Sequence, residues 1–259
     1  MNELSQKDLA KRALSLVDLT NLNDGCTAAD ITALTARAVT PHGAVAAVCI
    51  WPEFVAQAVR ELKGTGVNVA TVVNFPDGGT ETGKVVAETE QAIADGADEI
   101  DLVMPYRAFV EGRKGFAEEQ IIRVRDVIPE PGKLKVILET GEIKDPLLIH
   151  LASEIAIGAG ADFIKTSTGK VAVNATLEAA EIMLTAIEEA RRDHRAEVGF
   201  KPAGGIRTLA DAAAYLALAD RIMGPNWVSA ATFRFGASGL LDALIAEIEG
   251  TDAAGGEGY

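Results

Sequence analysis

Short β-type runs alternate with longer helical runs along nearly the whole chain, and this alternation predicts a parallel sheet with crossover helices. The expected strands are residues 17–22, 44–51, 68–74, 98–104, 134–140, 162–166, 197–201 and 232–236. The expected helices are residues 28–38, 53–62, 83–95, 116–128, 147–159, 177–192, 209–219 and 240–248. Eight strands with interleaved helices predict an α/β fold, a (β/α)8 TIM barrel.

The chain length fits one such barrel. It has 259 residues, and a single (β/α)8 barrel takes about 250. No linker rich in Pro, Ser or Gly divides the chain, so residues 1–250 are expected to form one domain. Residues 251–259 are rich in glycine and acidic residues that cannot pack a core, and they are expected to form a short flexible C-terminal tail.

Strand alternation directs an unusual set of polar side chains into the barrel. In the run 134–138 every second residue is apolar and should face the helices, which turns Lys135 inward. The same argument applied to the other strands also places Thr20 and Cys49 inside. Five strands are thus expected to bring charged groups to the interior, namely Asp18, Asp101, Lys135 together with Glu139, Lys165 and Lys201.

A cluster of interior lysines suggests amine chemistry. Neighbouring ammonium groups and desolvation both lower the pKa of a lysine, and a neutral lysine can form a Schiff base with a carbonyl. Asp101 could then move protons, directly or through water. The alternative is a buried set of ion pairs in which Asp101, Glu139 or Asp18 neutralises Lys135 or Lys201. Strand alternation alone does not say which lysine is the nucleophile.

Three glycine-containing loops follow the last three expected strands and resemble a phosphate cradle. In barrels, the loops after strands seven and eight frequently bind phosphate through backbone N–H groups and a helix N-terminus. The alternative is that these glycines only form tight turns. The candidate phosphate-binding residues are Gly169 and Lys170 after Thr168, then Gly204, Gly205 and Arg207, then Gly236, Ser238 and Gly239.

Composition excludes several other classes of function. The 24 Lys and Arg against 38 Asp and Glu give a formal charge of −14, so we expect no binding to nucleic acid or to a membrane surface. Two cysteines and three scattered histidines show no metal-ligand spacing, so we expect no metal. The first residues lack a signal peptide's apolar segment, and no run is long enough to span a membrane. A cytoplasmic protein is expected.

The chain resembles the 2-deoxyribose-5-phosphate aldolase family over nearly its whole length. The stretch 161–176 is a very specific match, and the terminal Tyr259 fits the long bacterial members. The segments that carry the resemblance are LVDLTNLN (16–23), ADEIDLVMPYR (97–107), KVILETGE (135–142), ADFIKTSTGKVAVNAT (161–176), GFKPAGGIR (199–207) and RFGAS (234–238).

The resemblance implies a role for each matched residue. Lys165 would form the Schiff base, with Lys201 as the neighbouring cation and Asp101 in the proton relay. Tyr259 would reach back to the active site and assist proton transfer. Phosphate would bind Lys170, Gly204, Gly205, Arg207 and the loop 236–239. Gly239 departs from the serine expected there, which removes one hydroxyl contact but keeps a backbone N–H. Supporting roles would fall to Asp18, Thr20, Cys49, Lys135 and Thr168.

The implied activity is class I aldol cleavage of 2-deoxy-D-ribose 5-phosphate to D-glyceraldehyde 3-phosphate and acetaldehyde, without a cofactor. The partners would be small phosphosugar and aldehyde substrates, and a homodimer is a hypothesis for the assembly. Three alternatives remain at this point: another lysine-dependent aldolase or transaldolase, a phosphosugar isomerase on the same fold, and a phosphate-binding barrel without catalysis.

Overall fold

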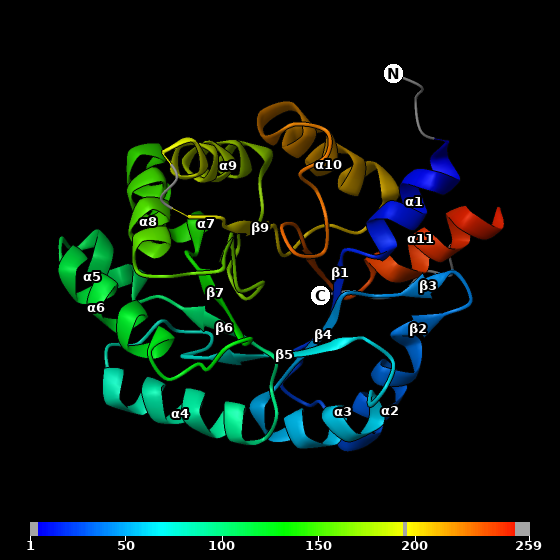
Figure 1. Cartoon of the computed structure of the whole chain (residues 1–259), viewed down its shortest axis with the longest axis horizontal. Helices are drawn as coiled ribbons and strands as arrows, with labels where there is room; N and C mark the ends of the chain where they lie inside the picture. Colours follow the sequence, from blue (N-terminus) through cyan, green and yellow to red (C-terminus); the bar gives the residue numbers. More distant parts are fainter. Residues whose placement is uncertain (1–4, 194–195, 252–259) are drawn as a thin grey trace.

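The computed structural model describes residues 5–193 and 196–251, which form a parallel barrel (Figure 1). Eight strands are hydrogen-bonded in the order β10-β1-β4-β5-β6-β7-β8-β9. Isolated parallel bridges, Phe200 to Phe233 and Ala203 to Gly236, close the gap between the first and last strands of this order. The strands are β1 Val17–Asn21, β4 Ala47–Ile50, β5 Asn68–Val73, β6 Glu99–Val103, β7 Lys133–Ile137, β8 Phe163–Lys165, β9 Gly199–Lys201 and β10 Phe235–Ala237.

Helices surround this ring of strands (Figure 1). No helix in the described part of the chain is both long enough and apolar enough to cross a membrane. The helices are α1 Gln6–Leu14, α2 Ala28–Arg37, the 3-10 helix η1 Pro52–Phe54, α3 Val55–Glu61, α4 Thr82–Ala94, α5 Tyr106–Val110, α6 Lys114–Arg125, α7 Thr140–Ile143, α8 Pro146–Gly158, α9 Leu177–Arg192, α10 Leu209–Met223 and α11 Leu240–Glu249. The predicted (β/α)8 barrel is therefore confirmed.

Some element boundaries differ from the sequence expectation. The strand expected at 44–51 is divided: β3 Gly43–Ala44 pairs antiparallel with β2 Val39–Thr40 in a separate ribbon, and only β4 joins the barrel. The strand expected at 134–140 ends at Ile137, because the chain turns at Glu139, whose φ is 61°. The expectation also omitted α1, whose N-terminus is capped by the Ser5 side chain and which packs against α10 and α11.

The barrel has two cores, as strand alternation requires. Outward-facing strand residues such as Val48, Ile100 and Ile164 are fully buried against the helices. Inside the barrel, Cys49 packs in a small separate apolar cluster with Leu22, Ala70 and Val72. This cluster comes from the β1, β4 and β5 side of the barrel, and charged side chains fill the remaining interior.

Candidate active site

Strand register brings the predicted interior lysines together. Lys165 on β8 is directly opposite Lys201 on β9. Lys135 on β7 is opposite Phe163, two residues before Lys165, and it is also opposite Asp101 on β6. Because side chains on parallel strands alternate in step, all four charged groups point into the same interior. The expectation that the lysines share one site with Asp101 is confirmed.

Asp101 is the centre of this charged group. Its Oδ1 accepts a hydrogen bond from Lys135 Nζ at 2.7 Å. Its Oδ2 accepts from Lys165 Nζ at 2.7 Å and from Lys201 Nζ at 2.8 Å. Burial alone would raise the pKa of the Asp101 carboxyl, but Lys135, Lys165 and Lys201 outweigh it and hold that pKa well below its usual range. Asp101 is therefore ionised at neutral pH.

Lys201 and Lys135 each have further carboxylate partners. Lys201 Nζ lies 2.5 Å from Asp18 Oδ2, and Lys135 Nζ lies 2.5 Å from Glu99 Oε2. Burial disfavours both ammonium groups, but the nearby carboxylates more than compensate and raise the pKa of Lys201 and of Lys135. The expected lowering of pKa by lysine clustering is thus wrong for these two, and the alternative of buried ion pairs with Asp101 and Asp18 describes them instead.

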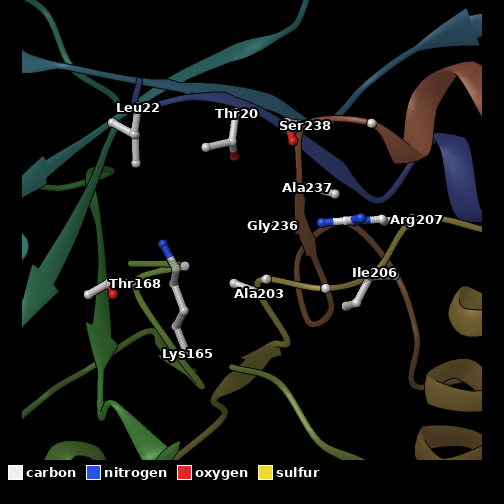
Figure 2. Close-up of a pocket in the computed structure, with 14 residues that line it drawn as sticks. Thr20, Leu22, Lys165, Thr168, Ala203, Ile206, Arg207, Gly236, Ala237 and Ser238 are labelled. Carbon is white, nitrogen blue, oxygen red and sulfur yellow. The ribbon is translucent and has the colours of Figure 1, made fainter. Parts of the chain in front are cut away.

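Lys165 has a different environment. In the described structure its Nζ has one carboxylate partner, Asp101, which it shares with the other two lysines. Figure 2 shows its side chain extending into a cavity, with Thr20 and Leu22 across from it and Thr168 beside it. Lys135 and Lys201 do not line that cavity. Of the three lysines, Lys165 is the one that a substrate can reach.

Two further charged groups, not predicted from the sequence, extend the cluster toward the amino ends of the strands. Arg234 donates to Asp18 Oδ1 at 2.8 Å and to Glu99 Oε1 at 2.8 Å. The same alternation that identified Asp101 could have found Glu99, two residues earlier on β6. We call the seven linked groups the ion-pair network: Asp18, Glu99, Asp101, Lys135, Lys165, Lys201 and Arg234.

The cavity lies at the carboxyl ends of the strands and is formed mainly by the predicted loops. The apolar residues Leu22, Ala203, Ile206 and Ala237 also line it and were not predicted. The predicted residues that line it are Thr20, Lys165, Thr168, Gly169, Gly204, Gly205, Arg207, Gly236, Ser238 and Gly239.

Two of the cavity glycines are required by their surroundings. Gly204 has a φ of +84°, and a Cβ there would lie 2.7 Å from Asn174 Cβ. A Cβ at Gly236 would lie 2.7 Å from Ala203 Cβ and 3.1 Å from Lys201 Cε. Both glycines let the loop backbones approach closely: the Gly204 N–H donates to the Gly236 carbonyl at 3.3 Å, and the Gly236 N–H donates to the Pro202 carbonyl at 2.9 Å.

A cation and a helix N-terminus lie at the glycine-lined end of the cavity. Arg207 lines it, and Gly239 is the N-cap of α11, with no side-chain cap on the helix N-terminus. Free N–H groups at a helix N-terminus favour an anion. Lys170 is not among the lining residues; its Nζ lies 3.1 Å from Asp24 Oδ1. A phosphate role for Lys170 stays a prediction.

Glu139 is a buried carboxyl beside the cavity. It accepts hydrogen bonds from the Thr168 hydroxyl at 2.6 Å and from the Thr168 N–H at 3.2 Å. Burial raises the pKa of Glu139 despite these bonds. Its role here is to hold the loop after β8, and thereby the wall of the cavity next to Lys165.

The remaining predicted residues fall in two places. The Cys49 Sγ lies 3.9 Å from Asp101 Oδ2, and burial followed by the Asp101 charge raises the pKa of the thiol. Cys49 is thus a buried neutral neighbour of the ion-pair network. Tyr259 and the rest of the tail beyond Thr251 lie outside the described residues.

Comparisons with known proteins agree with this site. The profile of the DeoC/LacD family aldolases matches residues 12–243. A deoxyribose-phosphate aldolase of Agrobacterium fabrum is 58% identical over 249 residues, covering 96% of this chain and 95% of that protein.

Solved structures give the same result. A candidate deoxyribose-phosphate aldolase of Toxoplasma gondii superposes with a TM-score of 0.86 at 28% identity, covering 95% of this chain and 99% of that one. One of Coccidioides immitis superposes with a TM-score of 0.78 at 31% identity, covering 91% and 85%. With a barrel of this topology and a reachable lysine over a glycine-lined cavity, the chain belongs to the DeoC/LacD family of aldolases.

Proposed function

We propose that this protein cleaves 2-deoxy-D-ribose 5-phosphate reversibly to D-glyceraldehyde 3-phosphate and acetaldehyde, with Lys165 as the Schiff-base nucleophile. The observation that carries the proposal is the difference between Lys165 and the other two lysines. Lys165 lines the cavity and, within the described residues, has one shared carboxylate partner, whereas Lys135 and Lys201 do not line the cavity and have further carboxylate partners of their own. Strand alternation left this choice open, and the family resemblance implied Lys165.

Charge balance in the ion-pair network supports the same assignment. The network holds the three carboxylates Asp18, Glu99 and Asp101. It holds four cationic groups when every lysine is protonated. Loss of one proton therefore makes the network neutral, and within the described residues Lys165 is the lysine that contacts the fewest of these carboxylates. A neutral amine is the form that attacks a carbonyl.

In the cleavage direction, Lys165 Nζ adds to the C1 aldehyde and water leaves, which gives an iminium. A base takes the proton of the C3 hydroxyl, the C2–C3 bond breaks, and its electron pair moves toward the iminium to form an enamine. Protonation of the enamine at C2 and hydrolysis release acetaldehyde and return the free lysine. Ionised Asp101, acting through water, is suited to accept these protons, and Lys201 stabilises its charge.

The phosphate would occupy the glycine-lined end of the cavity. There Gly205 and Gly239 offer backbone N–H groups, Gly204 lets the loop backbone lie close to the site, and Arg207 adds a cation. Binding the phosphate at this end sets the distance from it to the aldehyde carbon, so that C1 meets Lys165. Local cations are needed because the protein as a whole carries a formal charge of −14.

Reductive trapping tests the proposal. The protein is incubated with acetaldehyde and borohydride, digested, and mapped by mass spectrometry. The expected result is a two-carbon adduct on Lys165 that is absent in Lys165→Met. An adduct found on Lys201 alone, or none at all, would contradict the assigned nucleophile. Cleavage rates for 2-deoxyribose 5-phosphate and fructose phosphates then separate this reaction from that of another lysine-dependent aldolase or a transaldolase.

The same experiment separates two other classes. A phosphosugar isomerase with a carboxylate base would survive treatment with borohydride and carbonyl substrate. A phosphate-binding barrel without catalysis would bind the sugar phosphate with no turnover, and Lys165→Met would change nothing measurable.

The C-terminal Tyr259 is proposed to assist proton transfer at the enamine. Deleting it should slow exchange of the acetaldehyde methyl protons with solvent more than it weakens phosphate binding. NMR in deuterated water measures the rate of this exchange, and an unchanged rate would assign the tail no catalytic role.

A homodimer and a cytoplasmic location are likewise proposals. Light scattering across a dilution series tests the homodimer.

A further inference from the structure

The amino end of the barrel interior is closed by a charged pair that the proposed reaction does not use directly. Arg234 reaches both Asp18 and Glu99, and its guanidinium lies 5.5 Å from the centre of the Phe163 ring. Its Nε–H also donates to the Ala230 carbonyl. Arg234 and Glu99 border a second cavity, which is lined by residues at the amino ends of β5 to β8. They therefore separate that cavity from the lysines.

These two groups carry fixed charges. Burial disfavours both, but Asp18 and Glu99 raise the pKa of Arg234, and Lys135 and Arg234 lower the pKa of Glu99. Arg234 and Glu99 therefore act on the interior lysines through their charges, while the open side of Lys165 is the cavity at the carboxyl end.

We propose that Arg234 is a positioning residue for the reaction at Lys165, which rests on the function proposed above. Its guanidinium holds Asp18 against Lys201 and Glu99 against Lys135. Those two lysines then keep their protons, and Asp101 is shared among three ammonium groups. Removing the Arg234 charge leaves Asp18 and Glu99 short of a cation, so the ion-pair network retains the proton on Lys165 more strongly.

In the part of the chain that the structure describes, Arg207 lines the cavity with Lys165, and the charged and titratable groups that face Lys165 inside the barrel come from four elements. They are Asp101 on β6, Lys135 on β7 with Glu139 after its end, Lys201 on β9 and Cys49 on β4. Neither Arg234 nor Glu99 is among them, so both act through Lys135, Lys201 and Asp101. Changing either alters the charge of the network without removing any group that contacts Lys165.

Opposite charge changes should therefore move the pH dependence in opposite directions. The measurement is the rate of borohydride trapping of acetaldehyde on Lys165 as a function of pH, alongside kcat and KM. In Arg234→Gln the midpoint should rise by about half a unit to one unit, and in Glu99→Gln it should fall by a similar amount. The double variant should return close to wild type, and Arg234→Lys should keep most of the wild-type profile.

A matched control removes the same charge elsewhere. Arg221 is exposed and pairs with Glu181 at 3.0 Å, so Arg221→Gln should leave the midpoint in place. Circular dichroism checks folding of every variant, and Glu99→Gln alone still tests the direction if Arg234→Gln does not fold.

Each outcome is informative. Opposite shifts that cancel in the double variant support the proposal. Slower trapping with an unmoved midpoint, or shifts in the same direction for both variants, would show a purely structural role and overturn it. Absence of trapping in the wild type would instead refute the proposed function, so the two failures are distinguishable.

Discussion

The two ends of the barrel interior are formed by different kinds of groups. The carboxyl end is a cavity of loop backbone, glycines and a single reachable lysine. The amino end is packed with Arg234, Glu99 and Asp18 in contacts at 2.8 Å. Glycine-lined loops leave room for a ligand, whereas paired charges hold fixed positions. The difference indicates that charged groups at the amino end act on the lysines, whereas a substrate reaches Lys165 from the carboxyl end.

The largest effect is expected when the reachable lysine, Lys165, and a sealed lysine, Lys201, are each replaced by Met and compared. Lys165→Met should abolish adduct formation and lower kcat by about 10⁴-fold or more, because a nucleophile is lost. Lys201→Met should still form the adduct, but at a rate lower by about 10²-fold to 10³-fold, because Asp18 and Asp101 lose a cation. Single-turnover trapping on both variants gives the measurement. Equal losses would mean that the two lysines are not divided in role.

A smaller effect is expected in the cavity wall. Gly204→Ala places a Cβ 2.7 Å from Asn174 at a φ of +84°, so it should raise KM for the phosphosugar by about tenfold with a modest change in kcat. Gly64→Ala is the matched control, since Gly64 has a φ of +82° and open space around it. Equal KM values for the two variants would argue against phosphate binding at this loop.

The smallest effect concerns the bond between Thr168 and Glu139. Thr168→Val removes the hydroxyl that donates to this buried carboxylate at 2.6 Å, at a cost of about 1–3 kcal/mol in the free energy of unfolding. Folding already raises the pKa of Glu139. The protonated form is therefore favoured in the folded state, and stability is lost as pH rises through the folded pKa.

The variant should steepen that loss, because the ionised carboxylate no longer accepts the hydrogen bond of the Thr168 hydroxyl. Denaturant unfolding of Thr168→Val at several pH values gives the measurement. Glu139→Gln in the Thr168→Val background is the control and should flatten the pH dependence. A steep dependence in that control would assign the effect to another group.

Strand alternation was enough to predict the barrel and the shared position of Asp101, Lys135, Lys165 and Lys201. Alternation repeats every two residues, so it gives the face of a side chain but neither its partners nor its height in the barrel. The carboxylates of Asp18 and Glu99, which raise the pKa of the two sealed lysines, depend on register between strands far apart in the chain.

Other features depended on local geometry that the sequence pattern does not carry. Strand β7 ends earlier than the sequence predicted, because Glu139 adopts a left-handed backbone conformation, and its side chain accepts a hydrogen bond from Thr168. Strand alternation could not separate Lys165 from Lys201, since the two residues are opposite each other in register; the family resemblance implied Lys165, and the cavity gives an independent physical reason for that choice.

The closing seam of the barrel gives the phosphate a second effect. Ala203 and Gly236 face each other in an isolated bridge, and the Gly236 N–H donates to the Pro202 carbonyl at 2.9 Å. The loops proposed to hold the phosphate leave from the two sides of this seam. A bound sugar phosphate would then contact both strands at the junction that closes the barrel. It should therefore slow amide exchange at this junction and raise the melting temperature of the protein. Acetaldehyde alone carries no phosphate, so it should leave amide exchange at this junction unchanged.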